Sequence, residues 1–281
     1  MYKYMRDNLK DEYGILELQD KILETMVYLD DFLKRHDITY YIYGGSTLGA
    51  VRHHGFIPWD DDFDIAMDSK NYEKFLKVCD KDLDKEKYYL QKGNTEEYPN
   101  YYSKIRVNKT TYIEKENKDN MHQGIFIDVF CLDNAPDGKF ARKIQYISAV
   151  LLKAKAISSF KYETNSIKKK MVMGLSKLIV RGKIKNLLYK NVKKYNNSNT
   201  VCYTDVLVGR TQKNIYWPKE FFKCQKYVEF EKIRLPIPIQ SKNLLELQFG
   251  KDYMTPKVFL SHNTAWSTKI DYKEYGKDNN K

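Results

Sequence analysis

The sequence predicts an α/β (α+β) fold in which helices flank a mixed sheet and a basic helical region is added. Segments with the three-to-four-residue spacing of amphipathic helices alternate with short apolar runs over the first half of the chain. Glycine, asparagine and proline separate these runs, as they commonly do between strands. The chain has 281 residues, 42% of them hydrophobic, so it can bury a substantial core.

The N-terminal part predicts two long helices and two buried strands. Apolar residues recur three or four positions apart from Ile15 to Leu33 and again from Asn71 to Leu83, which places them on one face of each helix. The aromatic and β-branched run from Ile38 to Tyr43 predicts a strand that enters a tight turn. A short helix is expected from Thr47 to Val51, and the second strand from Phe63 to Met67.

The remainder predicts more strands, then helices, then a mixed C-terminal part. Helix formers dominate from Phe140 to Tyr195 and glycine is sparse there. A Pro-rich turn is expected at Leu235 to Pro238, a short helix around Leu244 to Phe249, and a frayed polar end after Trp266. The four short strands are expected at Tyr88–Gln91, Tyr101–Val107, Thr111–Ile113 and Ile125–Phe130.

These elements suggest four parts along the chain. They are a catalytic core over 1–135, a basic helical insertion over 136–200, a C-terminal part over 201–270 that completes the catalytic domain, and a flexible tail over 271–281. The sequence has neither a signal-like N-terminus nor a run of about 20 apolar residues, so we expect a cytoplasmic protein. The four cysteines lack C-x-x-C spacing, which argues against a zinc site or a disulfide framework.

Positive charge is concentrated in one region. Residues 139–195 contain 16 Lys and Arg and the single acid Glu163, so this region has a net charge of +15. Because the whole chain has a net charge of +12, the remaining residues have a net charge of −3. Leucine and isoleucine accompany these lysines, which predicts peripheral contact with the anionic inner face of the cell membrane. The alternative is a set of ordinary packed helices with solvated lysines. No nucleic-acid partner is expected, because the basic excess lies in helical sequence and no nucleic-acid motif is present.

Four aspartates lie within five consecutive positions that lead directly into an apolar strand: Asp60, Asp61, Asp62 and Asp64. If Asp62 and Asp64 lie on that strand, the two-residue period points them to the same face, with α-carbons roughly 6.5 Å apart. A divalent cation would offset their repulsion, and oxygen ligands favour Mg2+, with Mn2+ as the alternative. The competing interpretation is a solvated acidic loop.

A further carboxylate, Asp128, interrupts the strongly apolar run from Ile125 to Phe130. Because an unpaired buried charge is costly, we expect Asp128 to be the third metal ligand. A hydrogen-bonded aspartate near a strand end is the alternative, and Asp133 is a weaker candidate in a loop.

Phosphate-binding residues are expected beside these acids. Gly45 and Ser46 follow a strand and precede a helix, where backbone amides and a hydroxyl can face a phosphate, although this pattern taken alone is more often an ordinary turn. Arg52, Lys104 and Arg106 are candidates for binding diphosphate oxygens, and the two arginines are preferred for their bidentate geometry.

The stretch from Tyr43 to Met67, YGGSTLGAVRHHGFIPWDDDFDIAM, resembles the signature of the LicD family. The resemblance continues in Lys104-Ile105-Arg106 and in Gly124 to Asp128, and more loosely from Leu244 to Pro256. Bacterial members of that family transfer phosphocholine from CDP-choline to cell-surface glycans, including teichoic acid and lipopolysaccharide. Its fukutin-like members use a CDP-linked polyol phosphate, and its fold is similar to that of nucleotidyltransferases.

The resemblance implies roles for the residues above. Gly45 and Ser46 would bind donor phosphate, and Asp62, Asp64 and Asp128 would hold Mg2+ with Asp60 nearby. No activated cysteine or serine nucleophile is evident, so we expect direct attack by a glycan hydroxyl on the distal phosphorus of the donor. In that reaction Asp128 would act as the base, Arg52 or Arg106 would stabilise the departing CMP, and the acceptor would be a glycan or its lipid-linked precursor.

Two other functions remain open from the sequence. One is a nucleotidyltransferase that transfers the nucleotide itself to a small molecule or RNA, using the same acids. The other is a basic module that binds a membrane or nucleic acid without catalysis. Within the preferred function, choline, ribitol and glycerol phosphate are not distinguished, although phosphocholine is favoured.

Overall fold

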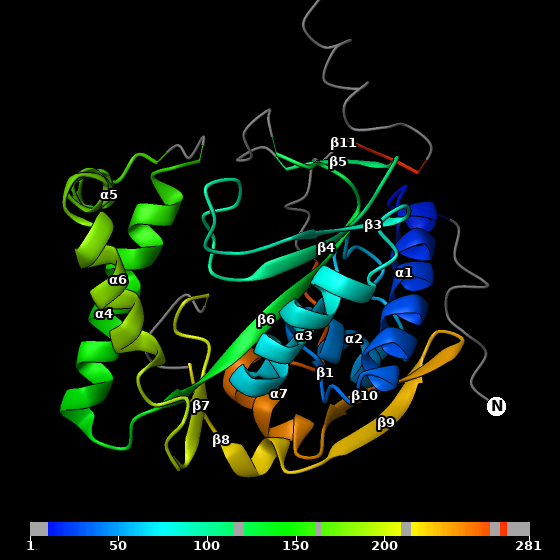
Figure 1. The fold of residues 1–281 in the computed structure, drawn as a ribbon. Coiled ribbons are helices and arrows are strands. Elements are labelled where there is room, and N and C mark those ends of the chain that lie inside the picture. The colour runs from blue at the N-terminus through cyan, green and yellow to red at the C-terminus, as the bar shows by residue number, and fades with distance from the viewer. Residues whose placement is uncertain (1–10, 115–120, 161–163, 209–214, 259–264, 269–281) are drawn as a thin grey trace, which may run out of the picture.

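A mixed sheet forms the centre of the fold in the computed structural model, which describes residues 11–114, 121–160, 164–208, 215–258 and 265–268. The main strands run in the order β1-β2-β6-β4-β3, with β7 added to β6 and β8 added to β7 (Figure 1). Strands β2 and β6 are parallel, and the other neighbours are antiparallel. The strands are β1 (Tyr41–Ile42), β2 (Asp64–Asp68), β3 (Tyr88–Gln91), β4 (Ser103–Val107), β6 (Phe126–Ala135), β7 (Cys202–Thr204) and β8 (Tyr216–Pro218). The predicted α/β class is confirmed.

Strand β6 is the longest strand and is buried along its whole length. It extends five residues beyond the predicted run, because Asp133 to Ala135 pair with β7 in a part of the chain for which the sequence predicted no strand. Its central position lets it contact β2, β4 and β7. The candidate ligand Asp128 therefore lies in the middle of the sheet.

Helices α1 (Leu16–Arg35) and α3 (Ser69–Asp82) pack against this sheet, and both contact β6. The predicted apolar face of α1 is confirmed, since its residues are at most 1% exposed and join the main core: Leu18, Ile22, Met26, Leu29 and Leu33. Both helices begin and end within a few residues of the predicted bounds.

Helix α2 (Gly44–His53) begins earlier than predicted. The Gly-Gly-Ser segment is its first turn rather than a loop before it, and the glycine at position 44 takes a positive φ of 55° that glycine adopts without strain. Helix α7 (Ser241–Phe249) packs against α2, which confirms the predicted C-terminal helix and brings it next to the glycines.

The predicted turn at Leu235 to Pro238 is wrong. These residues belong to β10 (Ile233–Pro238), which pairs antiparallel with β9 (Gln225–Phe230) in a two-stranded sheet. Proline lacks an N–H group for the ladder, but each strand of such a ribbon has a free edge where none is needed. Another two-stranded sheet joins β5 (Thr111–Ile113) to β11 (Ala265–Ser267), far apart in sequence.

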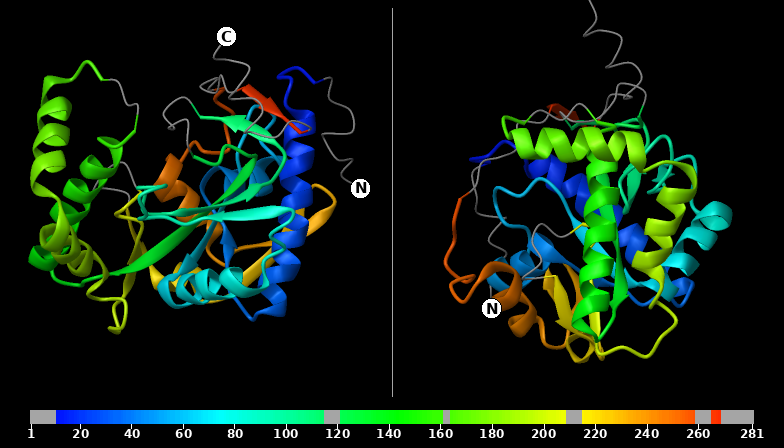
Figure 2. Two further views of the ribbon diagram at one scale, coloured as in Figure 1. Left: turned by 45° about the horizontal axis from the view of Figure 1, so that its top comes forward. Right: turned by 90° about the vertical axis from the view of Figure 1, so that its left-hand side faces the viewer.

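The basic region is helical, as predicted, and consists of α4 (Lys139–Ile157), α5 (Ile167–Ile179) and α6 (Gly182–Lys193). The right-hand view of Figure 2 shows α4 and α6 side by side, with α5 crossing their upper ends. They pack around a small second core, which includes Leu152, Val180 and Val192 and, from outside the helices, Tyr101 and Val206. Among the described residues, no helix is both long and apolar enough to span a membrane. The tail expected over 271–281 lies outside the described residues.

Candidate active site

Strands β2 and β6 place Asp64 directly opposite Asp128. The two are register partners in the parallel pair, and Lys104 of β4 is the register partner of Asp128 on its other side. The backbone N–H of Asp128 donates a 2.9 Å hydrogen bond to the Phe63 carbonyl, which fixes this register. Two candidate metal ligands and a cation therefore lie in one row across three strands.

Asp60 and Asp62 interact electrostatically with the pair formed by Asp64 and Asp128. Burial raises the pKa of Asp64 well above its ordinary value, and the charges of Asp62, Asp128 and Asp60 raise it further. Burial likewise raises the pKa of Asp60, again with help from Asp62. For Asp128, burial outweighs the opposing effect of Lys104 and raises the pKa to about 7. The acids form one repulsive cluster, which we call the carboxylate cluster (Asp60, Asp62, Asp64 and Asp128).

The charge of Asp61 also raises the pKa of Asp60, but the Asp61 side chain is hydrogen-bonded to Tyr112 and is not counted in the carboxylate cluster. It is only 5% exposed, and its Oδ2 accepts a 2.7 Å hydrogen bond from the Tyr112 hydroxyl. On the same loop, the Gln19 side chain donates to the Asp60 carbonyl at 2.8 Å and to the Ile57 carbonyl at 3.1 Å. Helix α1 and strand β5 thus hold the acidic loop in place.

The N-terminus of α2 touches the carboxylate cluster. A Cβ added at Gly44 would lie 3.0 Å from Asp64 Oδ2, and one added at Gly45 would lie 3.0 Å from Asp60 Oδ2. Ser46 is 5% exposed, and its Oγ accepts a 2.9 Å hydrogen bond from the Asp64 N–H. The structure therefore brings Gly45 and Ser46 to the acids, with the serine oxygen engaged by the backbone of β2.

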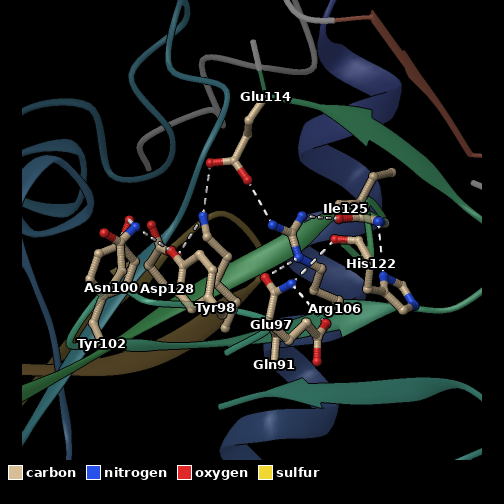
Figure 3. A network of polar contacts seen from close by, with 12 residues as sticks. Gln91, Glu97, Tyr98, Asn100, Tyr102, Arg106, Glu114, His122, Ile125 and Asp128 are labelled. Carbon is tan, nitrogen blue, oxygen red and sulfur yellow. Dashed lines mark hydrogen bonds and ion pairs between the residues drawn. The ribbon is translucent and has the colours of Figure 1, made fainter. Parts of the chain in front are cut away.

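Behind the cluster, Glu114 joins the two basic residues of β4 (Figure 3). The Lys104 Nζ lies 3.0 Å from Asp128 Oδ1 and 3.1 Å from Glu114 Oε1. Burial opposes ionisation of Glu114, but Lys104 and Arg106 outweigh it and lower the pKa of that carboxyl to about 2. Glu114 therefore stays charged and links the two cations.

Arg106 faces the protein interior. It is 0% exposed and donates hydrogen bonds of 2.8 Å to Gln91 Oε1 and to the Gly124 carbonyl, in addition to its 2.7 Å contact with Glu114. The predicted contact of Arg106 with donor phosphate stays a prediction. In the structure, the Arg106 guanidinium group is hydrogen-bonded to these three residues of the protein.

Arg52 lies on the open side, next to a cavity of about 340 Å³. It donates to the Tyr253 carbonyl at 2.8 Å and to His53 Nε2 at 2.9 Å. Burial lowers the pKa of Arg52, and the nearby Asp60 charge opposes that shift. The cavity reaches the carboxylate cluster through its lining, which includes Gly45, Asp60, Trp59, Tyr253 and Lys257.

Two properties of the carboxylate cluster suit a divalent cation: its oxygen donors and the mutual repulsion of its carboxylates. The cluster offers only oxygen ligands, the type that Mg2+ and Mn2+ prefer, and a cation would relieve the strain that raises these pKa values. Within the described ranges, no three His, Cys, Asp or Glu side chains are arranged as a ready-made metal site. Asp133 lies apart from the cluster, bound to Lys193 at 2.7 Å and to Asn196 at 2.9 Å.

Sequence reasoning did not identify Gln19, Tyr112 or Glu114 as parts of this site. Gln19 could have been found as a polar residue on the apolar face of a predicted helix, since it is 1% exposed. Glu114 directly follows a predicted strand and offered no comparable signal.

Comparison with known proteins supports the resemblance. The family described as "LicD/FKTN/FKRP, nucleotidyltransferase domain" matches residues 37–144, which contain the whole carboxylate cluster and the α2 N-terminus. The chain is 26% identical over 230 residues to the lipopolysaccharide cholinephosphotransferase LicD of Haemophilus influenzae. This match covers 76% of this chain and 82% of that protein. It is 51% identical over 67 residues to an uncharacterized protein of Rickettsia typhi, covering 24% of this chain and 22% of that protein. Residues 37–144, which hold the candidate site, therefore match the LicD/FKTN/FKRP nucleotidyltransferase domain.

Proposed function

We propose that this chain is a LicD-type transferase that moves a phosphorylated alcohol, with phosphocholine as the first candidate, from a CDP-linked donor to a hydroxyl of a glycan or lipid-linked glycan, releasing CMP. The observation that carries the proposal is the carboxylate cluster beside the glycine-rich N-terminus of α2. The Haemophilus relative, named as a cholinephosphotransferase, supports the choice of alcohol.

The donor would lie between the carboxylate cluster and the adjoining cavity. Gly45 and Asp60 border both, and Arg52 and Lys257 line the cavity as cations that can contact diphosphate oxygens. The absence of a Cβ at position 45 lets a phosphate approach the first turn of α2, where the helix dipole favours negative charge. The volume of about 340 Å³ suits a portion of a nucleotide.

The cluster residues would hold Mg2+, or Mn2+ in its place, through Asp62, Asp64 and Asp128, with Asp60 as a further acidic neighbour. When bound, that cation would neutralise the diphosphate and the charge that develops on CMP. Asp128 would take the proton from the acceptor hydroxyl, while Lys104 fixes the position of its carboxylate through the 3.0 Å contact. Arg52 would stabilise the departing phosphate from the cavity side.

The products of the reaction test this proposal. The protein would be incubated with Mg2+, a glycan acceptor and CDP-choline, CDP-ribitol, CDP-glycerol or CTP, and CMP and pyrophosphate would be measured with and without EDTA. Release of CMP that requires metal and acceptor supports phospho-alcohol transfer and names the alcohol. Asp62→Asn should lose at least ~100-fold in rate, whereas Asp31→Asn, an exposed position on α1, should not change.

The second candidate is a nucleotidyltransferase, favoured by the description of the matched domain. It would use the same cluster but attack the phosphorus next to the nucleoside. Pyrophosphate released from CTP, with no CMP from any CDP-linked donor, would replace the first proposal by this one.

A further inference from the structure

Helices α5 and α6 expose an unusual number of large apolar side chains. The four most regular lie on α5, where Ile167, Met171, Leu175 and Leu178 are 75%, 68%, 57% and 69% exposed. Val172 and Ile179 of α5 are also exposed, and these six residues form what we call the apolar face, while Ile184 and Leu187 are exposed on α6. Monomeric soluble proteins seldom expose so many apolar side chains together, and such surfaces mark interaction sites.

The apolar face is distinct from the surface by which α5 packs. Its four regular residues recur at intervals of four, four and three, which places them on one side of the helix. Ser176 is the buried residue that α5 contributes, and it lies between these positions in sequence but on another side of the helix. The apolar face therefore remains available after the helices have packed.

Lysines surround this face. Lys168, Lys169 and Lys170 are exposed in the first turns of α5, Lys177 is exposed near its end, and Lys183 is exposed at the start of α6. They belong to the region that carries a net charge of +15, whereas the rest of the chain sums to −3. Two copies of the chain would bring like charges together at this face, and a nucleic acid would leave its apolar side chains without a partner.

We propose that the apolar face docks on an anionic lipid bilayer. Its aliphatic side chains would enter the lipid interface while the lysine ammonium groups reach the anionic headgroups. The proposal does not depend on which phosphorylated alcohol the site transfers.

The position of α5 agrees with a membrane-linked acceptor. In Figure 1 and in the right-hand view of Figure 2, α5, β5 and β11 all lie along the upper side of the molecule, with α5 at the left and β11 at the right in Figure 1. Strand β5 leads directly into Glu114, which contacts Lys104 next to Asp128. A bilayer that covers this upper side would thus contact α5 and also lie over the side of the molecule that carries β5 and the Glu114 network.

Sedimentation with lipid vesicles tests the proposal. Vesicles of phosphatidylglycerol mixed with phosphatidylcholine should bind the protein at least ~10-fold more strongly than phosphatidylcholine alone, and raising the salt from about 0.1 M to about 0.5 M should weaken the binding. The double variant Met171→Gln/Leu175→Gln and the triple variant Lys168→Gln/Lys169→Gln/Lys170→Gln should each reduce binding at least ~10-fold. Circular dichroism checks that both variants fold.

Val201→Gln is the matched control, because Val201 is 64% exposed outside these helices and its replacement should leave binding unchanged. The proposal is overturned if the protein stays in the supernatant with anionic vesicles, or if it binds neutral and anionic vesicles equally. It is also overturned if light scattering shows a dimer that the double variant dissociates, since the face would then bind a second copy. Donor turnover in solution is measured separately, so loss of lipid binding and loss of the proposed activity can be distinguished.

Discussion

The Nζ of Lys104 lies 3.0 Å from Oδ1 of Asp128, and both side chains are buried within the sheet. The same ammonium group lies 3.3 Å from the centre of the Phe126 ring and 3.1 Å from Glu114. A single cation is thus held from three sides against the carboxylate cluster. Because it offsets part of the cluster charge, it can keep the Asp128 carboxylate in one orientation beside the other acids.

Replacing Lys104 by Met should therefore affect both activity and stability. Asp128 would lose the charge that opposes the effect of burial, so the pKa of Asp128 should rise further and the transfer rate should reach its plateau at a higher pH. Breaking a buried ion pair costs about 3 kcal/mol or more of unfolding free energy. The pH profile of CMP release and urea unfolding measure the two effects.

Lys92→Met supplies the control for that variant, since Lys92 is exposed in the loop between β3 and β4. It should leave the pH profile and the unfolding free energy unchanged. An unshifted profile in the Lys104 variant would show that this lysine does not influence Asp128 during turnover.

Removing one charge from the carboxylate cluster should stabilise the metal-free protein. The pKa of Asp64 is raised in the folded state, so its ionised form lowers stability above the ordinary pKa of the group and this penalty disappears as acid protonates it. Asp64→Asn should raise the melting temperature by several degrees at pH 8 and by little at pH 4. The same variant should be inactive.

Metal binding gives the complementary measurement. Mg2+ should raise the melting temperature of the original protein by relieving the repulsion, and Asp64→Asn should respond much less. Equal responses of the two proteins would indicate that Asp64 is not a ligand, and isothermal titration calorimetry would then locate binding elsewhere.

The glycine at position 45 offers a steric prediction. A methyl group there would lie 3.0 Å from Asp60 Oδ2, so Gly45→Ala should displace that carboxylate and obstruct donor phosphate. We expect a loss of at least ~10-fold in kcat/KM, equivalent to about 1.4 kcal/mol. Gly174→Ala on α5 is the matched control, because a Cβ there meets nothing within 4 Å and should instead stabilise the helix by about 1 kcal/mol.

Local pattern in the sequence predicted part of the arrangement of the acids. Alternation assumed that Asp62 and Asp64 share a strand, but β2 begins at Asp64 and Asp62 lies in the loop before it, where its charge still raises the pKa of Asp64. The apolar surroundings of Asp128 indicated a charge that needs a partner. The direct pairing of Asp64 with Asp128 could not be predicted, because it depends on the register between strands whose paired residues are 64 positions apart in sequence. Strand pairing over such a distance is set by the whole sheet.

The partners of Lys104 and Arg106 could not be predicted from the local sequence. Alternation gives Lys104 and Arg106 the same side of β4, but it does not say what faces that side. In the structure, Glu114 directly follows β5 and forms ion pairs with both Lys104 and Arg106. The β9–β10 pair is another case, because Pro236 and Pro238 signal a turn locally while pairing with β9 overrides that signal.

Asp205 provides a pH-dependent prediction away from the carboxylate cluster. It is 7% exposed and its Oδ2 accepts a 2.9 Å hydrogen bond from the hydroxyl of Tyr43, the residue that precedes α2. Burial raises the pKa of Asp205 from 3.8 to about 6, although the Tyr43 hydrogen bond and Lys153 both lower it. The folded protein therefore holds this proton more tightly than the unfolded chain, and stability falls as pH rises from about 4 to about 6.

Asp205→Asn keeps an oxygen that can accept the Tyr43 hydrogen bond but carries no charge. Above pH 6 the variant should be more stable than the original protein by ~1–3 kcal/mol, because each unit of pKa shift corresponds to about 1.4 kcal/mol. Below pH 4 the two proteins should unfold alike. Urea unfolding across this range measures the difference, with the exposed Asp31→Asn as a variant that should show none. A variant less stable than the original protein at pH 8 would mean that the attraction between Asp205 and Lys153 outweighs the cost of burying the charge.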